Sequence, residues 1–169
     1  MMLLEFDNLV AGYGAIRVLH GVSVQVAAGE VVALLGRNGA GKSTTIKILT
    51  TLLEKSSGKA TIDGLDIDDD QAKVRRIIGY CSQDVGVDDD LTARENLMLQ
   101  CSFHHIPKDK AKSKVEELLR KVRLTEAAER RLKTFSGGMR KRLDLASSLV
   151  SDPKVLFLDE PTTGLDPQS

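Results

Sequence analysis

The stretch from residue 36 to residue 43 carries the residue types that hold a phosphate group. It reads Gly-Arg-Asn-Gly-Ala-Gly-Lys-Ser and fits the pattern G-x-x-x-x-G-K-[ST]. In such a loop the glycines let the backbone approach the phosphates, and the Lys42 ammonium reaches the β and γ phosphates. The Ser43 hydroxyl can join the coordination shell of Mg²⁺. The pattern predicts a nucleoside triphosphate site made by the loop and the next residue: Gly36, Asn38, Gly39, Ala40, Gly41, Lys42, Ser43 and Thr44.

The segments on either side of this phosphate loop, residues 36–43, match what phosphate binding requires. The apolar run Glu30–Leu35 predicts a buried strand, and Ser43–Leu49 predicts a helix. Backbone N–H groups and the positive end of the helix would then face the phosphate oxygens. The alternative is a glycine-rich turn that only joins a strand to a helix, but such a turn has no need for Lys-Ser directly after its last glycine.

Two acids follow a second apolar run and could complete the chemistry of a nucleotide site. Residues Val155–Leu158 predict a buried strand that ends in Asp159 and Glu160. We expect Asp159 to hold Mg²⁺ through water and Glu160 to orient or deprotonate the water that attacks the γ-phosphate. The alternative is a strand that ends in two solvated acids.

A capped helix start lies between these two motifs. Ser136 is a favourable N-cap, and Gly137 and Gly138 would expose a helix N-terminus that could accept an anion. The run Phe135–Met139 resembles the signature loop of the ATP-binding cassette (ABC) ATPases, which usually reads Leu-Ser-Gly-Gly-Gln. The resemblance implies that the anion is the γ-phosphate of ATP held by a second protomer, either another copy of this chain or a homologous cassette. The alternative is an ordinary capped helix.

Three further residues fall where the same resemblance assigns a role. Tyr13 stands where an aromatic ring stacks on adenine, and Gln83 where a glutamine meets Mg²⁺ and the attacking water. Gln83 also begins the helical region that contacts the transmembrane partner in this family, and Asp166 corresponds to a contact with the opposite phosphate loop. Their alternatives are turn packing for Tyr13, a surface amide for Gln83 and a helix cap for Asp166.

The start and the remainder of the chain resemble different subfamilies of these ATPases. Residues 9–14 and 19–23 look like the ATPases of branched-chain amino-acid importers, whereas residues 135–146 are similar to drug-exporter ATPases of the daunorubicin-resistance type. A mosaic or engineered chain is therefore an alternative to a natural one, and no transported solute follows from the sequence.

Composition limits the partners. The chain of 169 residues has 24 basic and 24 acidic side chains, so its charge gives no argument for nucleic acid and we expect none to bind. Two cysteines are too few for a disulfide framework and favour a reducing compartment. We find no signal peptide and no apolar run of the ~18 residues that a spanning helix needs. The expected location is the cytoplasm, at the inner face of the membrane when a transmembrane partner is present.

The expected fold is an α/β P-loop NTPase with a mostly parallel core sheet. Alternating apolar residues in Leu3–Ala11 and Val18–Val26 predict an antiparallel pair of strands before it. A capping box at Thr92 and helical spacing beyond it predict an inserted α-helical subdomain over residues 85–135. We expect residues 1–169 to form one nucleotide-binding domain that is incomplete at its C-terminal end.

The resemblance also implies parts that would follow residue 169, among them a strand ending in a switch histidine. His20, His104 and His105 precede the position where that histidine belongs. We therefore expect ATP binding with weak hydrolysis, and self-association through an exposed sheet edge. The alternative is a nucleotide-binding module, truncated or minimal, without useful turnover. Whether the chain acts as an enzyme is left open by its sequence.

Overall fold

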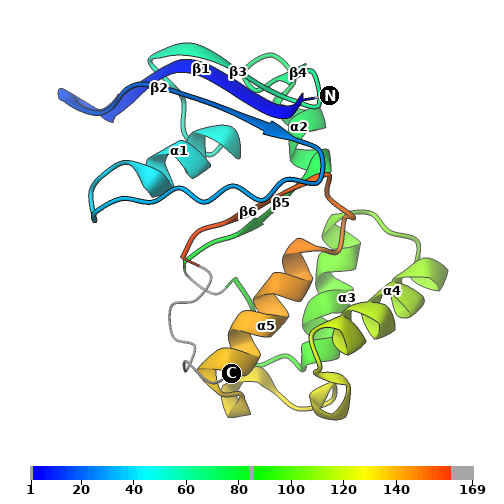
Figure 1. The fold of residues 1–169 in the computed structure, drawn as a ribbon. Coiled ribbons are helices and arrows are strands. Elements are labelled where there is room, and N and C mark those ends of the chain that lie inside the picture. Colours follow the sequence, from blue (N-terminus) through cyan, green and yellow to red (C-terminus); the bar gives the residue numbers. More distant parts are fainter. Residues whose placement is uncertain (1, 84–85, 161–169) are drawn as a thin grey trace. The chain divides into compact units, whose positions relative to one another are not determined.

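The computed structural model describes residues 2–83 and 86–160, which are drawn in colour in Figure 1. The chain divides into two compact units, one up to Ile78 and one from Gly79 onward. Along the described part of the chain no helix is long and apolar enough to cross a bilayer.

The first unit contains a four-stranded antiparallel sheet in the order β2-β1-β3-β4. Its long hairpin confirms the two strands predicted at the start of the chain. The burial in β1 changes parity along the strand, because Leu4 and Phe6 are buried and then Leu9 and Ala11. A register shift between Phe6 and Leu9 explains this change, since an extra residue in a strand exchanges its two faces. The strands are β1 (Met2–Tyr13), β2 (Ile16–Ala27), β3 (Ser57–Ile62) and β4 (Leu65–Asp66).

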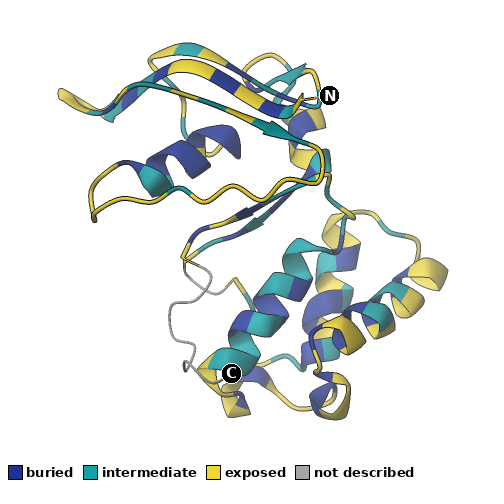
Figure 2. Ribbon diagram, in the orientation of Figure 1, coloured by how far each residue is buried: buried dark blue, intermediate teal, exposed yellow. Residues whose placement is uncertain are grey.

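Two helices complete the first unit, α1 (Lys42–Leu49) and α2 (Gln71–Ile77). The helix predicted over Ser43–Leu49 is confirmed. The buried strand predicted over Glu30–Leu35 is wrong, because these residues have no strand partner within the part of the chain that the structure describes. Val31 is 98% exposed, and Figure 2 shows a mostly exposed stretch between β2 and α1. An apolar run forms a strand only where neighbouring strands accept its backbone hydrogen bonds.

The second unit combines a small parallel sheet with a cluster of helices. Strands β5 (Ile78–Cys81) and β6 (Val155–Leu158) pair with each other. The strand predicted at the end of this region is confirmed, but only Phe157 in it is buried, while Leu158 is 38% exposed. Gly79 allows a close packing contact, because a Cβ atom there would lie 2.3 Å from the carbonyl oxygen of Ser148.

Helices form the larger part of the second unit and share one apolar core (Figure 1). Val115, Leu118 and Leu119 are fully buried at the helical spacing that the sequence shows. The capping box at Thr92 is confirmed by reciprocal bonds with Glu95. The bounds of 85–135 as a subdomain remain a prediction. The helices are α3 (Ala93–Phe103), α4 (Lys108–Lys121), α5 (Gly137–Ser148) and the short 3-10 turns η1 (Thr125–Ala127) and η2 (Leu132–Thr134).

Candidate functional site

Glycine sets the backbone of the phosphate loop. Gly39 and Gly41 have φ angles of 85° and 89°, in the left-handed region that other residues rarely adopt. A Cβ atom on Gly41 would lie 2.5 Å from Cδ2 of Leu19, whereas one on Gly39 would meet no heavy atom within 4 Å. Gly41 is thus required both for the chain direction and for close packing onto β2. Beside Gly39 the backbone borders open space.

The Lys42 side chain closes the loop. Its ammonium donates hydrogen bonds to the carbonyl oxygens of Gly36, at 2.8 Å, and Arg37, at 3.1 Å. Helix α1 begins at the same residue, and its N-terminus receives no side-chain cap. The N–H groups of a first helical turn have no partner inside the helix, so they point outward along its axis. Backbone donors, an ammonium and the hydroxyl of Ser43 therefore gather at one loop, and this donor set suits phosphate oxygens.

Tyr13 and the phosphate loop attach to the same end of the β1–β2 hairpin. Tyr13 is the last residue of β1, pairs with Ile16 and is 49% exposed. Gly41 packs against Val18 and Leu19, two and three residues beyond Ile16 in β2. The hairpin therefore holds an exposed aromatic ring and the loop near each other, whereas stacking of the ring on adenine remains a prediction.

The second unit gathers the predicted carboxylates and the glutamine at one edge of the small sheet. The backbone N–H of Asp159 donates to the carbonyl oxygen of Cys81 at 3.0 Å, which places the carboxyl ends of β5 and β6 side by side. Gln83 follows β5 by two residues and is exposed, while Asp159 is 4% exposed and Glu160 comes next. Carboxylate and amide oxygens are ligands that Mg²⁺ accepts. The structure thus brings Gln83, Asp159 and Glu160 to one edge, while the phosphate loop and Tyr13 belong to the first unit.

The signature loop, residues 135–139, begins α5 as predicted. The Ser136 hydroxyl accepts a hydrogen bond from the backbone N–H of Met139 at 3.3 Å. Phe135 is buried, and the Arg130 guanidinium lies 5.6 Å from the centroid of its ring. Ser136 and Gly137 are exposed. A buried aromatic ring thus anchors the loop, whose serine and first glycine are exposed while Gly138 is half-buried. Asp166, the remaining predicted contact, lies outside the described residues.

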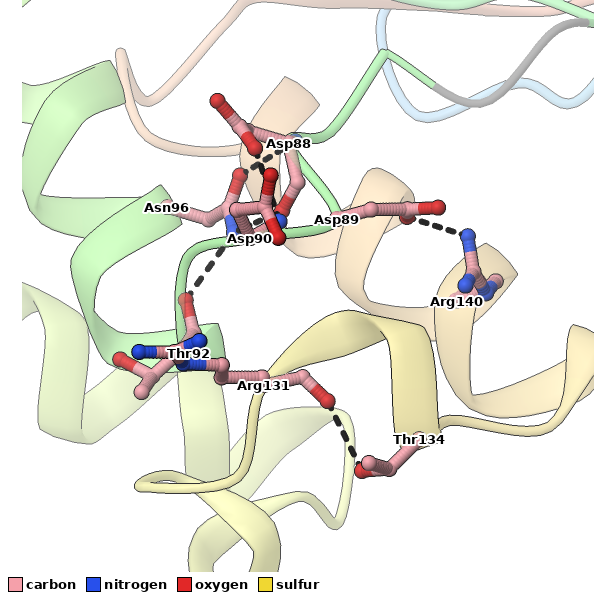
Figure 3. Close-up of polar contacts among 8 residues, drawn as sticks. All are labelled: Asp88, Asp89, Asp90, Thr92, Asn96, Arg131, Thr134 and Arg140. Atoms are coloured by element: carbon pink, nitrogen blue, oxygen red, sulfur yellow. Dashed lines mark hydrogen bonds and ion pairs between the residues drawn. The ribbon is translucent and has the colours of Figure 1, made fainter.

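An acidic loop, residues 88–90, contacts residues of α3 and α5 (Figure 3). Asp89 forms an ion pair with Arg140 in the first turn of α5. The buried Asn96 accepts from the N–H of Asp88 at 2.8 Å and donates to its carbonyl oxygen at 3.0 Å. Asp90 lies 3.7 Å from the Lys133 ammonium. These contacts tie the acidic loop to both α3 and α5.

Sequence reasoning did not identify two buried charged residues, Lys141 and Asp144. Both lie on α5, at 6% and 7% exposure, with their charged groups 3.8 Å apart. The Cys81 thiol donates to the Asp144 carboxylate at 3.0 Å. Burial, helped by the hydrogen bond to Asp144, raises the pKa of Cys81 to about 12. The signal in the sequence is a pair of opposite charges at i, i+3 within the apolar stripe of a helix.

The fold and the loop together define a nucleotide-binding domain of the P-loop class. A family model described as "ABC transporter" matches residues 19–163. The chain therefore belongs to the ABC transporter family, in which it corresponds to the ATP-binding domain. The family prediction made from the three motifs is confirmed.

The relatives include proteins named for drug resistance. The chain is 43% identical, over 96% of its length, to a daunorubicin resistance ATP-binding protein of Streptomyces coeruleorubidus, of which it covers 51%. It is 48% identical, over 94% of its length, to a doxorubicin resistance ATP-binding protein of Mycobacterium tuberculosis, covering 48% of that protein. The chain thus spans about half the length of the curated relatives it matches.

Solved structures of ABC ATPases have the same fold. The structure of cbiO1 from Clostridium perfringens, part of the ABC transporter complex cbiONQ, superposes with a TM-score of 0.89 at 31% identity, over 99% of this chain and 68% of that one. A dimeric ATP-binding cassette bound to ADP and Pi in a post-hydrolysis state has a TM-score of 0.86 at 28% identity, over 98% of this chain and 77% of that one.

Proposed function

We propose that this chain binds ATP with Mg²⁺ as the nucleotide-binding part of a membrane transporter. The geometry of the phosphate loop carries the proposal, because Gly41 holds a left-handed turn against Leu19 and Lys42 closes the loop from the first turn of α1. The sequence match to ATP-binding proteins over nearly the whole chain supports it. Relatives named for drug resistance favour an exporter over an importer.

The remaining site residues take the following roles in this proposal. Lys42 binds the β and γ phosphates, and Tyr13 stacks on adenine. Ser43, Gln83 and Asp159 hold Mg²⁺, whose charge would offset that of the phosphates. Glu160 orients or deprotonates the attacking water, and Gln83 helps to place that water.

A second protomer completes the nucleotide site in this proposal. Ser136, Gly137 and Gly138 of one copy face the γ-phosphate bound by the phosphate loop of another, and Asp166 contacts that loop. The exposed serine and glycine at a capped helix N-terminus support this role, as does the dimeric cassette among the similar structures. We further propose that a transmembrane subunit docks near Gln83 and the helical residues 85–135, which would hold the chain at the inner face of the membrane.

Hydrolysis of Mg-ATP across a series of chain concentrations tests this function. A site shared by two copies predicts a rate that rises with more than the first power of concentration. Glu160→Gln should lower the rate at least about a hundredfold, because it removes the base. Glu126→Gln, at an exposed position in η1, is the matched control and should leave it unchanged.

Two other outcomes are informative. ATP binding without turnover at any concentration would identify the chain as a nucleotide-binding module. A rate that Glu160→Gln does not alter would contradict the role of this carboxylate.

A further inference from the structure

The segment that carries Gln83 is held by one helix. Lys141, in the second turn of α5, donates from its ammonium to the carbonyl oxygen of Ser82 at 2.7 Å. Asp144, one turn further on, accepts from the backbone N–H of Gly86 at 3.2 Å and from the Cys81 thiol at 3.0 Å. Residues on both sides of Gln83 are therefore bonded to the same helix.

These bonds fix the direction in which the chain enters Gln83. The carbonyl group of Ser82 and the N–H group of Gln83 belong to one planar peptide unit, so the bond from Lys141 sets the orientation of that unit. The preceding peptide unit is held as well, because the carbonyl oxygen of Cys81 accepts from the N–H of Asp159. Two consecutive peptide units before Gln83 are thus constrained by groups of α5 and of the β6 end.

Burying Lys141 and Asp144 costs desolvation free energy. This cost argues that the two side chains have a specific role in holding the loop. Both side chains are more than nine-tenths buried, and buried charges are tolerated only when they are paired and hydrogen-bonded. Their hydrogen bonds reach Ser82 from Lys141, and Cys81 and Gly86 from Asp144. An apolar pair would fill the same space but would leave the Ser82 carbonyl and the Gly86 N–H without these partners.

We infer that Lys141 and Asp144 are positioning residues that set Gln83 for its contact with the Mg²⁺ of bound ATP. The same helix begins at Ser136, so the metal-side glutamine and the signature loop are attached to one rigid element. The role at Mg²⁺ rests on the proposed function. The hydrogen bonds that anchor the residues around Gln83 do not depend on it.

The test pairs two measurements on the full chain and on the variant Lys141→Met/Asp144→Ala, which removes both charges together. Hydrogen exchange by NMR follows the Gly86 amide without nucleotide. ATP affinity with and without Mg²⁺ gives the factor by which the metal strengthens binding. The matched control is Lys114→Met/Asp152→Asn, which removes an ion pair of the same unit, between α4 and the residues that precede β6.

We expect the Gly86 amide to lose protection in the variant while amides of α3 and α4 keep theirs. The Mg²⁺ factor should fall about tenfold, as is typical when the partner of a metal-site residue is removed, while affinity without metal stays the same. Adding Gln83→Ala to the variant should cause no further loss. The control should match the wild type in both measurements.

Contrary outcomes separate the two proposals. If the wild-type chain binds no ATP, the proposed function fails and with it the metal role, while the Gly86 amide still tests the anchoring. If ATP binds normally and the variant keeps both its Gly86 protection and its Mg²⁺ factor, the inference is overturned. Should the first variant not fold, Lys141→Met/Asp144→Asn keeps the volumes and an acceptor for Gly86; an unchanged Mg²⁺ factor there would also overturn it.

Discussion

The phosphate loop and the described residues that flank Gln83 are held in place by different means. In the phosphate loop the residues of the loop itself do this, through Gly39 and Gly41 at positive φ and through the Lys42 ammonium bonded to loop carbonyls. The described residues on either side of Gln83, namely Cys81, Ser82 and Gly86, are held by side chains from another element, Lys141 and Asp144.

This difference determines what a sequence motif can reveal. When a loop is shaped by its own glycines, one short sequence pattern contains both the residues that contact the ligand and the residues that support the loop. Where a distant helix supports a segment, the local sequence shows only the residue proposed to meet the ligand. The supporting residues lie some 60 positions away, since Cys81 and Asp144 are separated by 63 residues.

The largest effect should come from adding a methyl group inside the phosphate loop. Gly41→Ala combines left-handed backbone strain of ~1–2 kcal/mol with crowding against Leu19 that adds ~1–3 kcal/mol. Gly39→Ala is the matched control, because it has the same backbone strain and no neighbour within 4 Å. Thermal unfolding should therefore rank wild type above Gly39→Ala and Gly39→Ala above Gly41→Ala. Equal losses for the two alanine variants would refute close packing of the loop onto β2.

Helix caps in the second unit should have intermediate effects. Thr92→Ala removes one half of a capping box and should reduce the free energy of unfolding by ~1 kcal/mol. Ser136→Ala removes a longer single bond and should cost ~0.5–1 kcal/mol. Thr125→Ala, at an exposed position with no cap bond in the described structure, is the control. Urea unfolding measures the free energy of unfolding of all three variants. A loss in Ser136→Ala well above that in Thr92→Ala would contradict the single cap bond as the contribution of Ser136.

The smallest effect at neutral pH is that of Cys81, because its contribution to stability changes only in alkaline solution. Because the pKa of Cys81 is raised from 9.0 to about 12, the folded chain keeps this proton between these values while the unfolded chain loses it. Stability contributed by Cys81 is then complete below pH 9 and declines as pH rises toward 12. Cys81→Ser should remove this component, since a hydroxyl stays protonated there and can still donate to Asp144. Identical slopes of unfolding free energy against pH for both proteins would contradict the buried thiol donor.

The sequence predicted the elements whose pattern is local. The β1–β2 hairpin, α1, the cap at Thr92 and the start of α5 follow from alternation, glycine placement and capping residues, and the structure contains each of them. The phosphate loop was also predictable, since its pattern contains its own structural support.

The structural features that depend on residues far away in the sequence were not predictable. The run Glu30–Leu35 has the composition of a strand, but composition does not supply the neighbouring strand it needs. Lys141 looks like a surface residue beside Arg140 and Arg142, and only the fold shows its bond to Ser82. Sequence reasoning therefore found the residues proposed to touch ATP more readily than those that hold them in place.

The most direct test of the central claim is ATP affinity after Lys42→Ala, measured by isothermal titration calorimetry in the presence of Mg²⁺. Lys47→Ala is the matched control, because Lys47 lies on the same helix and is exposed. We expect ATP affinity to fall about 10- to 100-fold in Lys42→Ala, because a hydrogen bond from a charged group typically contributes that much to binding. ATP affinity should stay unchanged in Lys47→Ala. Equal affinity in Lys42→Ala and the wild type would contradict a nucleotide site at this loop.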